Sequence, residues 1–92
     1  MIVEFAKSFD KSVKKINDKV AIRRLITLIE KLKKAKSLDE ISNVTSLVHI
    51  PCLYRIRTGD YRLIVEEKER GGIEILLLEY LKRDDNTYRK YN

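Results

Sequence analysis

The chain has 92 residues, 43% hydrophobic and 37% charged, so it is long enough for one folded domain with a single core. One cysteine (Cys52) and one histidine (His49) exclude a disulfide framework, a cysteine-rich zinc site and a paired-histidine metal site. No apolar run approaches the roughly 20 residues of a membrane span, and the first residues lack the features of a signal peptide. We therefore expect a single domain over residues 1–92, a cytoplasmic location, and neither a metal nor a cofactor.

The net charge of +6 is distributed unevenly along the chain. Residues 1–36 carry a net charge of +7, whereas residues 37–92 carry −1. A basic half favours polyanionic partners such as nucleic acid or the ribosome, because its cations neutralise phosphates. Lysine-rich helix faces that only keep a small protein in solution would give the same pattern. Charge alone therefore leaves both interpretations open.

The first half of the chain predicts a short strand and two helices. Residues 2–5 alternate briefly between apolar and polar side chains, as a strand does. Ser8 is a candidate N-cap for a helix whose apolar positions are Phe9, Val13 and Ile16. After a turn at residues 17–18, a longer helix is predicted to end among lysines, with its apolar stripe at Ala21, Leu25, Leu28, Ile29, Leu32 and Ala35. The short connection predicts that the two helices pack as an antiparallel hairpin.

The second half predicts mainly strands. Residues 37–40 have the S-x-x-E form of a capping box and begin at most one helical turn, while residues 43–52 predict a loop or a frayed strand. Strands are then predicted over residues 53–57, 61–66 and 73–80, with turns at 58–60 and 68–72. The apolar run of the third strand indicates burial on both faces. Residues 84–92 are expected to form one or two helical turns or to be loose.

This order, β-α-α-β-β-β with a short C-terminal helix, defines an α+β fold of two layers. An antiparallel sheet packs on an N-terminal helical hairpin. Within the sheet, Arg55 and Arg57 share a face because side chains alternate along a strand. A loop of even length brings Arg62 to that face on the neighbouring strand.

The three arginines favour phosphate binding. Like charges that lie opposite one another in a sheet destabilise it by about a few tenths of a kcal/mol or more, so an anion is needed to offset them. Guanidinium groups match phosphate oxygens in geometry. The alternative is that Arg62 pairs with an acid while the other two arginines lie in solvent; the candidate acids are Glu66, Glu74 and Glu79.

The C-terminal segment adds cations and tyrosines beyond the last predicted strand. Lys82 and Arg83 come first, followed by Tyr88 and Tyr91 among further basic residues. Tyrosines interleaved with Arg and Lys suit stacking on unpaired bases. For Tyr88 this interpretation and a structural one stay open, whereas for Tyr91 we favour an anchor on the sheet.

Other candidate residues point to structural roles. Cys52 has only His49 nearby as a base, so we expect a buried thiol, and His49 itself is expected to be structural. Three acids at the second hairpin tip are expected to form a solvated charge run: Glu66, Glu67 and Glu69. The sequence contains no glycine-rich phosphate loop and no Ser/His/Asp arrangement.

Residues 54–63, YRIRTGDYRL, resemble the Y-R-I-R-x-G-D-Y-R signature of the RelE/ParE superfamily, the toxins of type II toxin–antitoxin modules. The resemblance covers essentially the whole chain, because the Phe5 and Phe9-Asp10-Lys11 opening, the lysine-rich second helix, the strands and the basic end follow in family order. RelE-like members cleave mRNA in the ribosomal A site, whereas ParE-like members poison DNA gyrase. Fold alone does not separate these activities.

For a RelE-like member, the resemblance implies metal-free cleavage in which a ribose 2′-hydroxyl attacks the adjacent phosphate. On the motif match, Arg55 and Arg57 fall at the basic strand positions of the family, and Arg62 falls on its phosphate-binding arginine. Lys82 or Arg83 would supply the C-terminal basic group. Tyr88 would be the tyrosine that stacks on a base or orients the substrate. Substitution of Arg62 by alanine is then expected to remove activity and leave the fold intact.

The resemblance also implies partners. These are mRNA in the ribosomal A site, 16S rRNA contacted by the Lys/Arg-rich helices, and a cognate antitoxin that covers the basic cleft or lays a helix or strand on the sheet; no membrane is implied. Many relatives carry a C-terminal histidine as acid or base where this chain has Lys82-Arg83. Because arginine stays protonated, Lys82 is the titratable replacement. A ParE-like gyrase inhibitor and an inactive toxin relic remain as alternatives.

Overall fold

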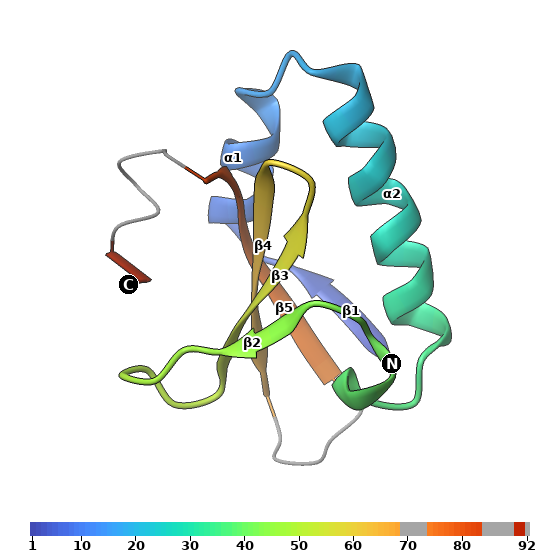
Figure 1. Cartoon of the computed structure of the whole chain (residues 1–92), viewed down its shortest axis with the longest axis vertical. Helices are drawn as coiled ribbons and strands as arrows, with labels where there is room; N and C mark the ends of the chain where they lie inside the picture. Colours follow the sequence, from blue (N-terminus) through green and yellow to red (C-terminus); the bar gives the residue numbers. More distant parts are fainter. Residues whose placement is uncertain (69–73, 84–89, 92) are drawn as a thin grey trace.

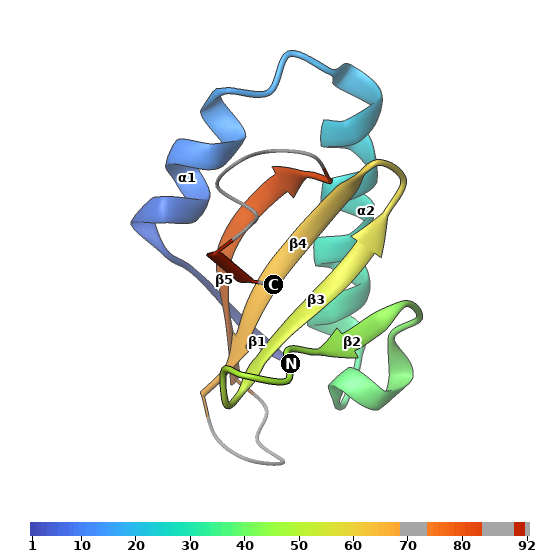
Figure 2. The ribbon, with the colours of Figure 1, turned by 60° about the vertical axis from the view of Figure 1, so that its left-hand side comes forward.

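The computed structural model describes residues 1–68, 74–83 and 90–91. Two helices cover one face of a five-stranded sheet, which confirms the two-layer α+β fold (Figures 1 and 2). The elements are β1 (Ile2–Phe5), α1 (Lys7–Lys14), α2 (Lys19–Lys34), the 3-10 helix η1 (Leu38–Glu40), β2 (Val44–Ser46), β3 (Leu53–Thr58), β4 (Tyr61–Glu67) and β5 (Glu74–Lys82). The predicted second turn and the predicted C-terminal helical turns fall mainly outside the described residues.

The sheet has the strand order β1-β5-β4-β3-β2 and is mixed, whereas the sequence predicted an antiparallel sheet. Strands β2 to β5 are antiparallel to their neighbours, but β1 runs parallel to β5, with Ile2 opposite Glu74 and Phe5 opposite Leu77. The chain crosses from β1 through both helices before it builds the meander, so β1 meets β5 at the far edge. The segment predicted as a loop or frayed strand contributes the short edge strand β2.

The structure confirms the predicted start of α2 but not the predicted N-cap of α1. The predicted cap Ser8 lies inside α1, which begins after Ala6, and its hydroxyl donates to the Leu78 carbonyl at 2.6 Å. The prediction of a Ser8 cap is therefore wrong, because the side chain ties α1 to β5 instead. At the predicted turn, Asp18 caps α2, and its carboxylate accepts from the backbone N–H groups of Val20 and Ala21 at 2.9 and 3.1 Å.

The predicted capping box at residues 37–40 does not form. Ser37 precedes η1, which is one helical turn long, as expected, but its side chain makes no cap hydrogen bond. The Glu40 carboxylate accepts from the backbone N–H of Lys36 at 2.8 Å, one residue earlier than a reciprocal box requires. The acid still stabilises the start of the turn.

The core lies between the helices and the sheet. The predicted stripe of α2 faces it, and Leu32 is fully buried. Tyr80 of β5 is 1% exposed, and its hydroxyl donates to the Ala21 carbonyl at 2.9 Å. Its backbone N–H donates to the Ser12 hydroxyl at 2.9 Å, so this residue joins β5 to both helices. Burial raises the pKa of Tyr80 to about 12.

A β-bulge in β5 decides which of its residues face the helices. Ile64 pairs with Glu79, but the next residue, Val65, pairs with Leu77, which leaves Leu78 as the extra residue. Before the bulge Leu77 faces the helices, and after it Tyr80 does. Glu79 consequently lies on the other side of the sheet, which we call the open face, and the strand is buried on both faces as predicted.

Candidate functional site

The β3–β4 hairpin closes through a two-residue turn. Thr58 pairs with Tyr61, so Gly59 and Asp60 form the loop, which is one residue shorter than predicted. Its even length is the condition that places Arg62 on the same face as Arg55 and Arg57. Gly59 has φ = 61°, a conformation that favours glycine. A Cβ at this position would lie 2.1 Å from Nη1 of Arg24, because the arginine of α2 packs directly against the turn.

The register confirms that the three arginines share the open face. Arg57 lies directly opposite Arg62, and Arg55 lies opposite Ile64, one row away. Alternation along the strands therefore groups the three guanidinium-bearing residues at one end of the hairpin. Arg57 is exposed and Arg55 is half-buried, whereas Arg62 is only 8% exposed.

Arg62 is held by its own hairpin. Its Nη1 donates to the carbonyls of Tyr61 and Gly59 at 2.9 and 3.2 Å. Within the described residues it forms no ion pair with the acids proposed as alternatives, Glu66, Glu74 and Glu79. The guanidinium is thus fixed in orientation by one nitrogen, which leaves Nε and Nη2 as donors toward an anion.

The structure separates the two C-terminal basic residues. Lys82 pairs with Tyr61, which places it on the helix-covered face, opposite to Arg62. Arg83 follows the strand, and its backbone N–H donates to the Asp60 carbonyl at 2.8 Å. Arg83 is therefore the residue tied to the end of the arginine hairpin, and Tyr88 lies outside the described residues.

Glu79 is a buried acid on the open face that sequence reasoning considered only as a partner for Arg62. It is 7% exposed, and Nζ of Lys90 lies 2.6 Å from its Oε1. The hydroxyl of Tyr91 donates to the same oxygen, while the ring packs against the cluster of Ile64 and Leu81. This confirms the predicted role of Tyr91 as an anchor, and its pKa is raised by burial and then by Glu79.

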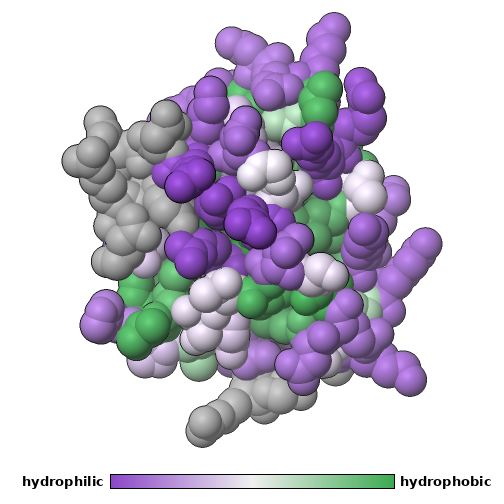
Figure 3. Space-filling view, viewed as in Figure 1, coloured by the Kyte–Doolittle hydropathy of each residue, from purple (hydrophilic) through white to green (hydrophobic). Residues whose placement is uncertain are grey.

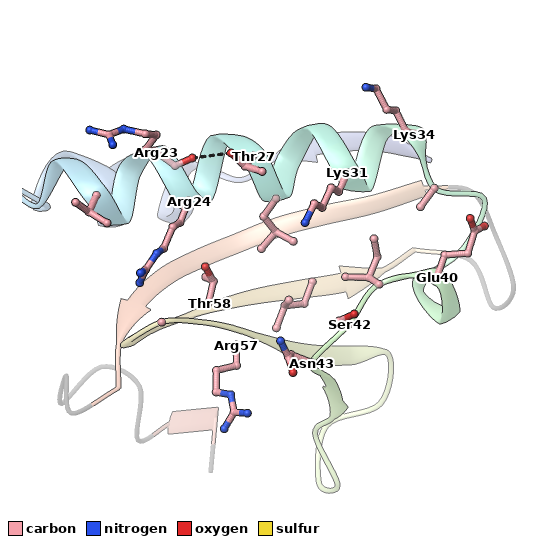
Figure 4. Close-up of a pocket in the computed structure, with 16 residues that line it drawn as sticks. Arg23, Arg24, Thr27, Lys31, Lys34, Glu40, Ser42, Asn43, Arg57 and Thr58 are labelled. Atoms are coloured by element: carbon pink, nitrogen blue, oxygen red, sulfur yellow. Dashed lines mark hydrogen bonds between the residues drawn. The ribbon is translucent and has the colours of Figure 1, made fainter.

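A basic groove of about 920 Å³ separates α2 from β3 and from residues 40–43. Arg24 and Lys31 point into it, whereas Arg23 and Lys34 point away (Figure 4). Its floor is apolar, formed by side chains that include Leu28, Ile41 and Ile56. Among the described residues that line it, Glu40 is the one acid. The surface on this side combines hydrophilic side chains with exposed apolar areas (Figure 3).

Cys52 is exposed, so the prediction of a buried thiol is wrong. The residue adopts φ = 64° in the turn before β3, and its carbonyl accepts from the Glu67 N–H at 2.8 Å. His49 is exposed in the same turn. Glu66 and Glu67 are half-buried rather than fully solvated, and Glu69 lies outside the described residues.

The described part of the chain lacks two kinds of feature. No group of three His, Cys, Asp or Glu residues there could hold a metal ion. None of its helices has the length and apolar character needed to cross a membrane.

Comparison with solved structures identifies the fold. The chain is 26% identical to RelE in the RelB–RelE antitoxin–toxin complex from Methanococcus jannaschii, with a TM-score of 0.79 over 97% of this chain and 99% of that one. The RelBE2 toxin–antitoxin complex from Mycobacterium tuberculosis matches at 18% identity, with a TM-score of 0.62 over 89% of this chain and 96% of that one.

A mutant of the Escherichia coli toxin RelE, in complex with an antitoxin RelBc peptide, matches at 18% identity and a TM-score of 0.58, over 97% of this chain and 90% of that one. The last two similarities concern the fold alone. No protein-family model and no curated protein sequence matches the chain. The arginine hairpin therefore belongs to a RelE-like α+β domain, and the chain is a member of the RelE/ParE toxin superfamily.

Proposed function

We propose that this RelE-like chain is the toxin of a type II toxin–antitoxin module and cleaves mRNA on the ribosome in the cytoplasm. Residues 1–92 would form one toxin domain. The observation that supports this most is the open-face cluster of Arg55, Arg57 and Arg62 on a RelE-like fold. Three cations on adjacent strands, one of them oriented by its own turn, suit a phosphate group.

The proposed reaction is an internal transfer at one phosphate. The 2′-hydroxyl loses its proton as its oxygen forms a bond to phosphorus, and the 5′-oxygen of the next nucleotide leaves and gains a proton, which gives a 2′,3′-cyclic phosphate and a free 5′-hydroxyl. Negative charge accumulates on the phosphorane oxygens, and guanidinium donors that are already oriented stabilise it without reorganisation. Two hydrogen bonds to backbone carbonyls of the hairpin fix the orientation of the Arg62 guanidinium. Arg55 and Arg57 supply further positive charge.

Three residues of the C-terminal segment differ in what they can contribute to this reaction. Lys82, the titratable candidate from the sequence, lies on the opposite face from Arg62. Arg83 is assigned to charge stabilisation, because a guanidinium stays protonated. Tyr88 is assigned to base stacking by resemblance. We propose that the ribosome orients the 2′-hydroxyl for in-line attack, since positioning alone supplies a large part of such rate enhancements.

The same proposal includes two macromolecular partners. The solved relatives are complexes with RelB antitoxins or an antitoxin peptide, and we propose a cognate antitoxin for this chain. The groove beside α2 offers Arg24 and Lys31 to acidic side chains above an apolar floor. The exposed lysines of α2 are proposed to contact 16S rRNA phosphates, which predicts strong dependence on salt.

Primer extension on a defined mRNA, with purified protein and with or without programmed ribosomes, tests this function. We expect cuts that need ribosomes and that an Arg57→Met variant makes much more slowly. Lys68→Met is the matched control, because it removes an exposed cation at the other end of the hairpin. Absence of cuts with ribosomes present would refute the proposal.

A gyrase inhibitor is the second candidate. It is favoured by the single histidine, because His49 lies in the turn between β2 and β3 and not at the end of β5. An inhibitor that acts by protein contact needs no proton acceptor beside the arginines. Loss of supercoiling activity when gyrase is mixed with the purified chain, without any mRNA cleavage, would establish this alternative.

A further inference from the structure

Both described partners of the buried Glu79 carboxylate come from the end of the chain. Nζ of Lys90 lies 2.6 Å from Oε1, and the Tyr91 hydroxyl donates to the same oxygen. The Glu79 side chain is 9% exposed, whereas that of Lys90 is 54% exposed. A carboxylate is rarely buried unless it is paired, so these contacts define a specific docking point. We call this group the Glu79 anchor.

Apolar packing adds to the anchor. The ring of Tyr91 contacts the small cluster formed by Ile64 and Leu81 on the open face. Lys90 also lies 5.1 Å from the centre of that ring. Burial of the ring, the hydrogen bond and the ion pair all favour the same position of the chain end.

The anchor lies next to the arginine cluster. Glu79 pairs with Ile64, and in the adjacent row Leu81 pairs with Arg62, which in turn pairs with Arg57. Tyr91 therefore packs against a cluster whose two buried members are both neighbours of Arg62 on the open face: Ile64 on the same strand and Leu81 on β5. At the other end of the connection, the Arg83 N–H is bonded to the hairpin turn at Asp60.

We propose that Glu79 is a positioning residue that docks Lys90 and Tyr91 on the open face, where the chain end forms one side of the anion site around Arg62. The inference rests on the proposed function, since it concerns substrate held on that face. Glu79 itself accepts no proton from substrate in this role. It acts through the two residues that it holds.

The test combines a structural and a kinetic measurement on the full chain. Glu79→Gln removes the charge, and Tyr91→Phe removes only the hydroxyl bond. Glu66→Gln is the matched control, because Glu66 is a half-buried acid that also lies on the open face, on the neighbouring strand β4. The {1H}-15N NOE of Lys90 and Tyr91 reports order at the chain end. Ribosome-dependent cleavage provides kcat and KM separately.

We expect both anchor variants to lower the NOE at residues 90–91 and to lower kcat by on the order of tenfold or more, as misplacement by about 1 Å can. The control should change neither. An unchanged NOE in both anchor variants would refute the anchor. A lowered NOE with unchanged kcat and KM would show a purely structural contact. A wild type that cuts no mRNA would overturn the positioning role and the proposed function together, while the NOE would still decide whether the anchor exists.

Discussion

Arg62 is predicted to stabilise the hairpin as well as to bind anions. Replacing it with methionine keeps an apolar stem of similar length and removes the guanidinium. The change eliminates the hydrogen bonds to the carbonyls of Tyr61 and Gly59. Hydrogen bonds to a charged group contribute about 1.5–3 kcal/mol each in favourable cases.

Two effects reduce the expected loss. Gly59 is exposed, so water can replace the bond to its carbonyl. Removing one charge also relieves the repulsion from Arg57, directly opposite, by about 0.2–1 kcal/mol. We therefore expect Arg62→Met to lower the free energy of unfolding by about 1.5 kcal/mol. For a domain of this size the melting temperature should fall by roughly 6–12 °C.

Thermal unfolding followed by circular dichroism checks this, with Arg57→Met as the matched variant. Arg57 lies across the same pair of strands but is exposed, so its substitution should change stability by less than about 0.5 kcal/mol. If both variants melt at the wild-type temperature, Arg62 contributes nothing to the hairpin. The sequence-based expectation that Arg62 can be removed without cost to the fold would then hold.

Three further predictions concern the hairpin turn and the core. The pKa of Tyr80 is raised from 10.0 to about 12, so its contribution to the free energy of unfolding is complete below pH 10 and is lost as the pH rises toward 12. In urea titrations at several pH values, Tyr80→Phe should therefore lose less stability at alkaline pH than the wild type does. Gly59→Ala should cost about 1–2 kcal/mol in urea denaturation, because it forces alanine into a left-handed conformation against Arg24; wild-type stability would contradict the turn geometry. Leu32→Ala should cost about 2–5 kcal/mol by the same measurement, because Leu32 is fully buried, and a loss below 1 kcal/mol would be inconsistent with that burial.

Local rules predicted the elements and one feature of the site. The apolar stripe of α2 and the change to period two located the helix and the hairpin. The shared face of Arg55, Arg57 and Arg62 followed from side-chain alternation and an even loop, so an error of one residue at each strand end did not affect it. These features depend only on residues that are close in sequence, so the hydrophobic period and the parity of the loop length are sufficient to predict them.

Features that depend on distant pairing were missed. Ser8 matched an N-cap pattern, but a carbonyl of β5 captures its hydroxyl. The bulge at Leu78 reverses the alternation of β5, so Lys82 falls on the helix-covered face while Glu79 falls on the open face. The acid within the run Leu76–Leu81 was a usable signal, because a charge in an otherwise apolar strand needs a partner.

The proposed function is best tested by ribosome-dependent cleavage by the wild type and by Arg57→Met, measured side by side on one mRNA. Arg57 is exposed, so its loss should leave the fold intact and remove one cation from the open face. We expect cuts by the wild type only when ribosomes are present, and a rate at least about tenfold lower for the variant, as loss of one charge-stabilising donor implies. Equal cleavage by both proteins would contradict the assignment of activity to the arginine face.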